Sequence, residues 1–528
     1  MTPNSPAPLP RPPFLCRRPF LWALVGVGAA LRVFQYVSDT SLWFDELSLV
    51  RNLVHRSASQ LLREPLEYHQ VAPVGFMVAE KGISHVLGTS DLAFRFLLLP
   101  IGLAALVLFV RLAERLLEGY AVPFAVAAFA IGGPFIRYSA EIKQYGIDVA
   151  AMLALSLIAL RLRDADATWT RCALAGCAGA ILVWFSQGTV FVVAGLGAAL
   201  LLAWLRDRDA QTRRAILVAV PIWAAAAAAA TLVSLRHMSP ATKAFMEQFW
   251  RYRGGFFPWP LRKPGDALWL WDRVTQLFGD GMVLRYPWPA VYSILAIAGM
   301  IVLWRRNRFG ALVLLGPFAV TALAAVAQQY PFRTRLVLFL LPALLLAVAQ
   351  AAEWIRQRAA RLHPAVGGVL MAALFFAPAR AFLETPPPYR IEDHKSVLAF
   401  FREYRKPGAA EYGLGPNDYQ LGGCWRDDRR AYLRDVDRYR GLSRVWLIAG
   451  GVPPFHQARS SIESYLAAIG VRREGITIPS EKPLDPVSAD LFDLSDPARL
   501  AAASADTFPL PPPGDLLPVC GEWVLPVR

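Results

Sequence analysis

The chain has 528 residues, of which 55% are hydrophobic and 18% charged, and this composition excludes an ordinary soluble protein. Its 55 Lys and Arg residues outnumber its 40 Asp and Glu residues, giving a net charge of +15. Because the basic residues lie mostly in short loops between apolar runs, membrane topology explains the excess better than nucleic-acid binding.

Apolar runs of about 17 to 22 residues predict a polytopic α-helical membrane protein. We expect about eleven membrane-spanning helices, the first uncleaved and preceded by a disordered cytoplasmic leader at residues 1–19. The predicted spans lie at about 20–36, 93–110, 121–136, 145–160, 172–186, 188–205, 215–235, 288–304, 310–327, 332–352 and 364–379.

Arginine clusters predict the orientation, because short basic loops stay on the cytoplasmic side. With about eleven spans the clusters at the ends of alternate spans all fall on one side. We therefore expect a multi-pass protein of the bacterial inner membrane, with a cytoplasmic N-terminus and a periplasmic C-terminus. A transmembrane domain would occupy residues 20–380, with outer loops at 38–92 and 236–287, followed by an extracytoplasmic domain at 381–528.

The first outer loop contains two amphipathic patterns, around Val50 to Leu62 and Phe76 to Leu87, which predict helices lying along the membrane surface. The second outer loop is rich in aromatic and basic residues. It is either an aromatic belt at the headgroup level or a wall that contacts a lipid-linked or saccharide ligand.

Beyond Pro388 the composition becomes that of a soluble segment. Strands predicted at 411–414, 444–449 and 475–478 alternate with helices predicted at 395–404 and 460–469, which indicates a small α/β domain. Cys424 and Cys520 lie in this segment and are either a disulfide or two free thiols. The sequence contains no nucleotide-binding glycine loop and no zinc-protease motif. Energy or an activated substrate must come from elsewhere.

Two adjacent carboxylates, Asp45 and Glu46, stand at the start of the first amphipathic helix. Asp45 could cap that helix while Glu46 favours its first turn. Alternatively, a carboxylate partly desolvated by Trp43 and Phe44 is a general base for an acceptor hydroxyl.

Several short motifs, in order along the chain, resemble those of the GT-C glycosyltransferases. The similarity is greatest to the protein O-mannosyltransferase and lipid A aminoarabinose transferase family, whose members take a sugar from a polyprenyl phosphate. It covers roughly residues 20 to 350 and rests on WFDE at 43–46, QVAPVGFM at 70–77, LGTSDLAFRF at 87–96, and then Pro134, Arg137, Tyr138, Ser139, Gln144, Tyr145, Tyr330, Pro331, Phe332 and Arg335.

This resemblance implies that Asp45 activates the acceptor, with Glu46 tuning its charge or holding a metal. A like-charged neighbour would raise the pKa of the Asp45 carboxyl. His69 and Glu80 are further candidate metal ligands, beside structural or solvated alternatives, and the need for a divalent metal stays open.

Cations at the outer ends of the spans are candidates for binding the donor phosphate, although they could simply snorkel. These are Arg95, Arg333 and Arg335, of which Arg335 lies in the family-like segment. The candidates for lining the sugar pocket are His69, Lys81, Arg137, Tyr138, Glu141, Lys143, Gln144 and Tyr145.

The predicted function is inverting transfer of a sugar from a polyprenyl phosphate to an extracytoplasmic hydroxyl of a protein, lipid A or envelope glycan. The alternative is a transporter or flippase for a lipid-linked saccharide. A transporter is expected to carry its ionisable groups near the bilayer midplane, whereas the carboxylates here lie together at the outer ends of the predicted spans.

Overall fold

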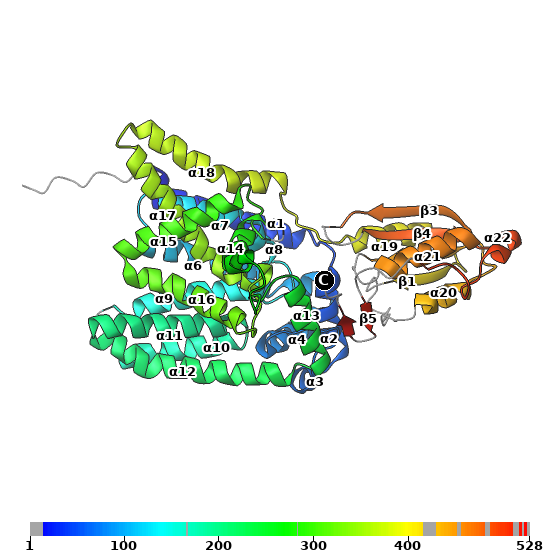
Figure 1. The fold of residues 1–528 in the computed structure, drawn as a ribbon, viewed down its shortest axis with the longest axis horizontal. Coiled ribbons are helices and arrows are strands. Elements are labelled where there is room, and N and C mark those ends of the chain that lie inside the picture. Colours follow the sequence, from blue (N-terminus) through cyan, green and yellow to red (C-terminus); the bar gives the residue numbers. More distant parts are fainter. Residues whose placement is uncertain are drawn as a thin grey trace, which may run out of the picture.

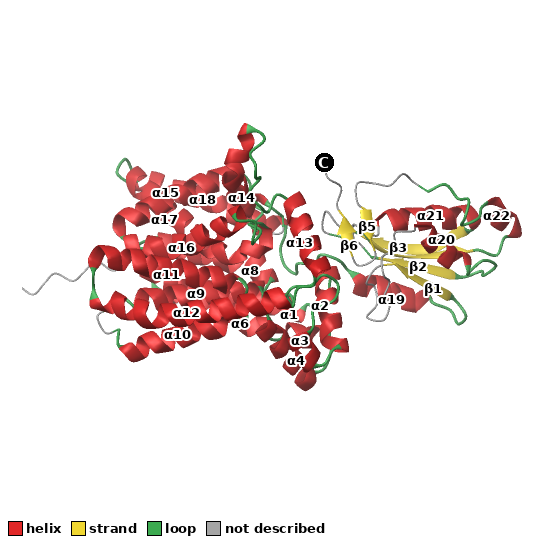
Figure 2. Ribbon diagram, turned by 60° about the horizontal axis from the view of Figure 1, so that its bottom comes forward, coloured by secondary structure: helices red, strands yellow, loops and turns green. Residues whose placement is uncertain are grey.

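The computed structural model describes residues 14–164, 167–281, 283–414, 429–450, 456–480, 486–510, 517–519 and 522–524. A large helical bundle is followed by a smaller C-terminal α/β region that lies beside one end of the bundle (Figure 1). Both views show the short helices α2, α3 and α13 at that end (Figure 2). The cysteines Cys424 and Cys520 lie outside the described residues.

The bundle confirms the predicted membrane class. By length and composition, eight helical segments of the described chain can cross a bilayer. They are α1 (Arg18–Val37), α5 with α6 (Asp91–Arg95, Leu98–Leu116), α11 (Gly188–Asp207), α12 (Ala210–Arg236), α15 (Pro289–Arg306), α16 (Arg308–Val326), η3 with α17 (Thr334–Leu340, Leu341–Ala359) and α18 (Pro364–Glu384).

Three further predicted spans fall on shorter helices, α7 (Ala121–Ile131), α9 (Tyr145–Arg161) and α10 (Trp169–Val183). Every predicted span therefore coincides with a helix, while the number of membrane crossings stays a prediction. The shortest, α7, stops at Gly132 and is followed at once by α8 (Gly133–Arg137).

The fully buried side chain of Arg32 explains how α7 can end inside the bundle. Its guanidinium donates to the carbonyl oxygens of Ala130 at 3.2 Å and Phe129 at 3.5 Å, and to that of Gly28 in its own helix at 2.9 Å. The last carbonyls of a helix have no partner within it, and a cation there also meets the negative end of the helix dipole. Arg32 thus fixes the break that leads into α8 and the turn after it.

The first outer loop folds into three helices, not two, before α5 begins: α2 (Phe44–His55), α3 (Ala58–Arg63) and α4 (Val74–Leu87). The first predicted pattern is divided because Ser57 caps α3, accepting a hydrogen bond from the Gln60 N–H. These helices enclose a core of their own around Val50, Leu53 and Phe76, all fully buried. Part of the apolar face that we expected to meet lipid therefore packs within the protein.

The second outer loop forms α13 (Pro240–Tyr252), η2 (Pro264–Leu268) and α14 (Trp269–Gly279). Its aromatic residues divide between two environments. Trp250 and Trp269 are buried, and the Trp269 indole N–H donates to the Gly254 carbonyl at 2.9 Å, whereas Trp259 is 71% exposed. The loop therefore has both a packed wall and outward-facing aromatics.

The C-terminal region contains a four-stranded sheet in the order β1-β2-β4-β3, with β1 parallel to β2 and the other pairs antiparallel. The strands are β1 (Ala410–Leu414), β2 (Val445–Ala449), β3 (Val471–Ile478) and β4 (Val487–Asp493). Its helices are α19 (His394–Tyr404), α20 (Arg429–Asp437), α21 (His456–Ile469) and α22 (Pro497–Ala502), and a further strand pair is β5 (Leu517–Val519) and β6 (Glu522–Val524). Two separate apolar clusters include residues of this sheet, one with α20 and α21 and one with α19.

Candidate active site

Asp45, in the first turn of α2, is held by two cations and an amide. Its Oδ1 lies 3.0 Å from Lys143 Nζ and 3.3 Å from Gln70 Nε2, and its Oδ2 lies 2.9 Å from Arg335 Nη2. Burial alone would raise the pKa of this carboxyl, but the charges of Lys143 and Arg335 outweigh it and lower the pKa to about 2. Asp45 is therefore ionised, and it joins three distant parts of the chain.

Glu46 turns the other way, which corrects the expectation that it raises the pKa of Asp45. Its carboxylate accepts two hydrogen bonds from Arg95, at 2.7 and 3.1 Å, and one from the Ile142 N–H at 2.9 Å. It also reaches back to the N–H of Trp43 at 3.3 Å, as an acidic residue at this helix position commonly does. With only 1% of its surface exposed, Glu46 is placed as a structural anchor and not as a metal ligand.

Arg95 is also fully occupied, so its place in the structure opposes the predicted phosphate-binding role. Besides Glu46 it donates to the carbonyl oxygens of Thr40 and Ser41, at 2.5 and 3.2 Å. The side chain is 3% exposed. Arg95 and Glu46 together tie α5 to the segment that leads into α2.

The turn between α8 and α9 brings the predicted pocket residues next to Asp45. Lys143 Nζ donates to Gln70 Oε1 at 2.7 Å, and Glu141 accepts from Arg137 Nε at 2.7 Å. Burial lowers the pKa of Lys143, and the charge of Asp45 opposes this shift. The Tyr138 hydroxyl and the Gln144 amide oxygen are buried without a hydrogen-bond partner in the described chain, so they remain available to a ligand.

Arg335, which contacts Asp45, belongs to a group of four arginines whose charges influence one another. Arg335 lies over the rings of Trp43 and Tyr145, at 5.1 and 5.8 Å. Burial and then the neighbouring Arg335 and Arg333 lower the pKa of Arg253 to about 10. The set is completed by Arg273 in α14, whose pKa is lowered to about 10 by burial and by Arg333.

Like charges repel one another, so the arginine cluster (Arg253, Arg273, Arg333 and Arg335) favours binding of an anion. The acidic groups that act on its members include Asp45 on Arg335 and Asp280 on Arg333. Sequence reasoning singled out Arg333 and Arg335 but not Arg253 or Arg273 as site residues. The only signal for those two was the mixture of arginine and aromatic residues in the second outer loop.

The remaining predicted residues lie apart from this network. His69 stacks on Phe245, with ring centroids 4.5 Å apart, and its Nδ1 lies 3.4 Å from Thr242 Oγ1. Lys81 Nζ donates to the Leu53 carbonyl at 2.6 Å. These contacts connect the first outer loop to α13 and α4 to α2.

Glu80 is a buried carboxyl on α4 whose two oxygens have no hydrogen-bond partner in the described chain. Burial raises its pKa to about 9, so the group is a neutral acid at pH 7. The candidate metal ligands Glu46, His69 and Glu80 do not come together. In the described ranges no three His, Cys, Asp or Glu side chains are placed to hold a metal ion.

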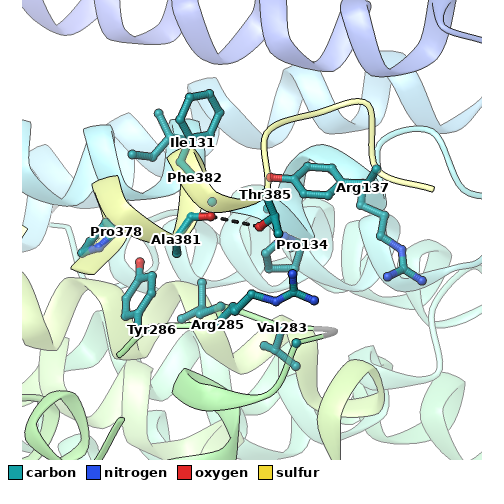
Figure 3. A pocket seen from close by; sticks show the side chains of 15 residues that line it. Ile131, Pro134, Arg137, Val283, Arg285, Tyr286, Pro378, Ala381, Phe382 and Thr385 are labelled. Atoms are coloured by element: carbon teal, nitrogen blue, oxygen red, sulfur yellow. Dashed lines mark hydrogen bonds between the residues drawn. The ribbon is translucent and has the colours of Figure 1, made fainter. Parts of the chain in front are cut away.

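A small cavity of about 40 Å³ lies on the Arg137 side of this network. Its walls come from the α7–α8 junction, from Gly281 and residues 283–286, and from α18, with Arg137, Arg285, Tyr286 and Thr385 among the lining side chains (Figure 3). The buried Tyr286 hydroxyl has no hydrogen-bond partner among the described residues. Arg137 also lies over the ring of Trp43, at 5.9 Å, so Trp43 contacts both a residue of the cavity wall and Arg335.

Comparison with solved structures confirms the predicted fold, that of the GT-C membrane glycosyltransferases. ArnT from Cupriavidus metallidurans bound to undecaprenyl phosphate is similar with a TM-score of 0.50, at 11% identity, over 89% of this chain and 98% of ArnT.

Weaker similarities extend to two other enzymes. The Archaeoglobus fulgidus oligosaccharyltransferase gives a TM-score of 0.44 at 13% identity over 73% of this chain, which spans only 56% of that enzyme's length. The mycobacterial arabinofuranosyltransferase AftD gives 0.43 at 14% identity, over 91% of this chain and 40% of AftD. No protein-family model and no curated protein sequence matches the chain.

Proposed function

We propose that the protein is a membrane glycosyltransferase that moves a sugar, with inversion, from a polyprenyl phosphate to an extracytoplasmic hydroxyl group. The observation that carries this proposal is a single ionised carboxylate, Asp45, held between Lys143 and Arg335 beside the arginine cluster. Arg335 thus pairs with the proposed base, Asp45, and also belongs to the arginine cluster that is the proposed anion site. The similarity in fold to ArnT bound to undecaprenyl phosphate supports a lipid-borne donor.

The donor phosphate binds the arginine cluster, with Arg335, Arg253 and Arg333 as its main contacts. Guanidinium groups suit phosphate because they donate several hydrogen bonds in one plane. As the bond between the anomeric carbon and the phosphate oxygen breaks, negative charge grows on that oxygen. The arginines are already in position to stabilise it.

Asp45 accepts the proton of the acceptor hydroxyl while the acceptor oxygen bonds to the anomeric carbon from the opposite face. The polyprenyl phosphate leaves with the bonding electron pair. A carboxyl whose pKa is about 2 is a weak base, but the incoming phosphate competes with Asp45 for Arg335. Losing part of that cation raises the pKa of Asp45, so donor binding strengthens the base.

The acceptor enters through the cavity beside Arg137. Its aromatic and hydroxyl side chains, including Tyr286 and Thr385, suit a ligand that carries both hydroxyl groups and apolar faces. Filling this space should therefore weaken acceptor binding alone. An Ala381→Phe substitution in the cavity wall serves this purpose, because it lies away from every contact of Asp45.

In the cell we place residues 20–380 in the bacterial inner membrane and residues 381–528 in the periplasm. The N-terminus would be cytoplasmic, and the acceptor would be a protein, lipid A or an envelope glycan. Cysteine substitutions at exposed positions, labelled from outside intact cells with a membrane-impermeant maleimide, test this orientation. Labelling at Leu362 but not at Tyr252 would contradict it, since both side chains are more than half exposed.

The reaction is tested in proteoliposomes that contain the purified protein, undecaprenyl-phosphate-linked pentoses or hexoses, and an extract of envelope lipids and proteins. We expect release of undecaprenyl phosphate together with a glycosylated acceptor, both measured by mass spectrometry. Empty liposomes are the control. Movement of the intact lipid-linked saccharide across the bilayer without any sugar transfer would contradict the proposal and favour a flippase.

A further inference from the structure

The chain between α18 and α19 runs along the segment that joins α1 to α2. The main-chain N–H of Tyr389 donates to Gln35 Oε1 at 2.6 Å, and Gln35 Nε2 donates to the main-chain carbonyl of Tyr389 at 3.1 Å. Further on, Ser41 Oγ donates to Asp393 at 3.1 Å and accepts from the Lys395 N–H at 2.9 Å. The C-terminal α/β region is therefore anchored to the approach to α2 (Figure 1).

The innermost of these contacts is made by Glu392, whose side chain is fully buried. Its Oε2 accepts from the main-chain N–H of Phe44 at 2.7 Å and lies 3.1 Å from His394 Nε2. Phe44 is the first residue of α2. The first N–H groups of a helix have no partner within it, and a carboxylate there is also favoured by the helix dipole.

Trp43, at the N-cap position, has no side-chain oxygen and therefore caps none of the first N–H groups of α2. Glu46 covers the N–H of Trp43 itself, so the one at Phe44 depends on Glu392. The Phe44 side chain packs against the apolar cluster of the C-terminal region that contains Tyr432, Leu433 and Leu466. Both the main chain and the side chain of the first residue of α2 thus meet the C-terminal region.

We propose that Glu392 is a positioning residue, through which the C-terminal α/β region caps the catalytic helix and fixes Asp45 between Lys143 and Arg335. This inference rests on the proposed function. Asp45 follows Phe44 directly, so fraying of the first turn moves its carboxylate away from partners at 3.0 and 2.9 Å. Displacement by about 1 Å is enough to cost a large part of the rate of an enzymatic reaction.

Three full-length variants in proteoliposomes test this role. Glu392→Ala removes the acceptor, and Glu392→Gln keeps an oxygen that accepts from the Phe44 N–H. Arg459→Ala is the matched control, because Arg459 is buried in the same region but contacts Glu463 and Ser488, away from α2. Two quantities are measured: release of undecaprenyl phosphate from the donor that the wild-type protein uses best, and hydrogen exchange of the amides at residues 43–48.

We expect Glu392→Ala to lower turnover by about tenfold while the KM for the donor changes less than threefold. Glu392→Gln should keep at least half of the activity, and Arg459→Ala should match the wild type. Equal activity of Glu392→Ala and wild type, or equal losses in Glu392→Ala and Arg459→Ala, would overturn the inference.

Hydrogen exchange separates this inference from the proposed function. If the wild-type protein turns over none of the donors, the proposed function fails and exchange alone decides whether Glu392 caps α2. Faster exchange at residues 43–48 in Glu392→Ala, but not in Arg459→Ala, supports the cap. Unchanged exchange in Glu392→Ala overturns it.

Discussion

Asp45 and Glu46 are neighbours in sequence, yet they belong to regions with opposite properties. Glu46 lies in a closed region, where Arg95 and two main-chain N–H groups satisfy its carboxylate. Asp45 lies in a more open one: its side chain is 15% exposed, against 2% for Glu46, and its partner Arg335 acts with Arg333 on Arg253. A closed ion pair stabilises structure, whereas partners that can be exchanged allow a carboxylate to take part in chemistry.

The largest effect on stability is expected from breaking the closed region. Arg95→Met leaves the Glu46 carboxylate buried without its cation and should lower the free energy of unfolding by about 3–5 kcal/mol. Thermal unfolding in detergent measures this loss. Arg56→Met is the matched control, because Arg56 pairs with Glu67, whose side chain is 60% exposed, and should cost less than about 1 kcal/mol. Equal losses would show that the Glu46–Arg95 pair contributes no more to the free energy of unfolding than the Arg56–Glu67 pair does.

A substitution in the open region should change the affinity for the ligand. Arg335→Lys keeps the positive charge but loses the planar donor geometry, so we expect the Kd for undecaprenyl phosphate to rise by about tenfold. Binding to the protein in nanodiscs provides the measurement, and Arg262→Lys, an exposed change in the second outer loop, is the control. An unchanged Kd for Arg335→Lys would show that Arg335 does not bind the phosphate.

The ion pairs of Asp45 in the open region should also make the stability of the protein depend on pH in acid. The folded-state pKa of Asp45, about 2, lies below its ordinary value of 3.8. Its ion pairs therefore contribute stability above pH 4, and this contribution disappears as the pH falls toward 2. The loss is about 2 kcal/mol, since each pKa unit corresponds to about 1.4 kcal/mol. Comparing the acid unfolding of wild type and Asp45→Asn isolates it, and identical profiles would contradict the assigned ion pairs.

The raised pKa of Glu80 should have the opposite consequence for stability. Above pH 4.5 the unfolded state ionises this group while the folded state keeps it neutral, so folding becomes less favourable as the pH rises toward 9. Glu80→Gln should remove this dependence, which amounts to about 4 kcal/mol between pH 5 and pH 8, because each pH unit between the two pKa values corresponds to about 1.4 kcal/mol. A stability difference that does not depend on pH would show that Glu80 is ionised in the fold.

Much of the fold follows from local sequence patterns, because apolar runs and basic loops act over short distances in the chain. The predicted strands at 411–414, 444–449 and 475–478 coincide with β1, β2 and part of β3. The strand β4 and the helix α20 were not predicted. The neighbours of β4 in the sheet are distant in sequence, and α20 has a strongly polar composition, so neither carries a clear local pattern.

The candidate site is less predictable because it depends on contacts across the chain. The sequence predicted that Asp45, Lys143 and Arg335 would gather at the outer face, and the structure places Lys143 Nζ and Arg335 Nη2 at 3.0 and 2.9 Å from the Asp45 carboxylate. It did not indicate that Glu46 turns toward Arg95, since adjacent carboxylates look equivalent in a sequence. Nor did it indicate the contact of Glu392 with α2, which joins residues 348 positions apart.

The most direct test of Asp45 as the general base compares donor turnover by the wild-type protein and by Asp45→Asn in the same proteoliposomes. We predict that the variant binds undecaprenyl phosphate but releases it from the donor about 10²–10⁴ times more slowly, the usual contribution of a general base. A folded Asp45→Asn protein that transfers sugar at the wild-type rate would contradict the central claim.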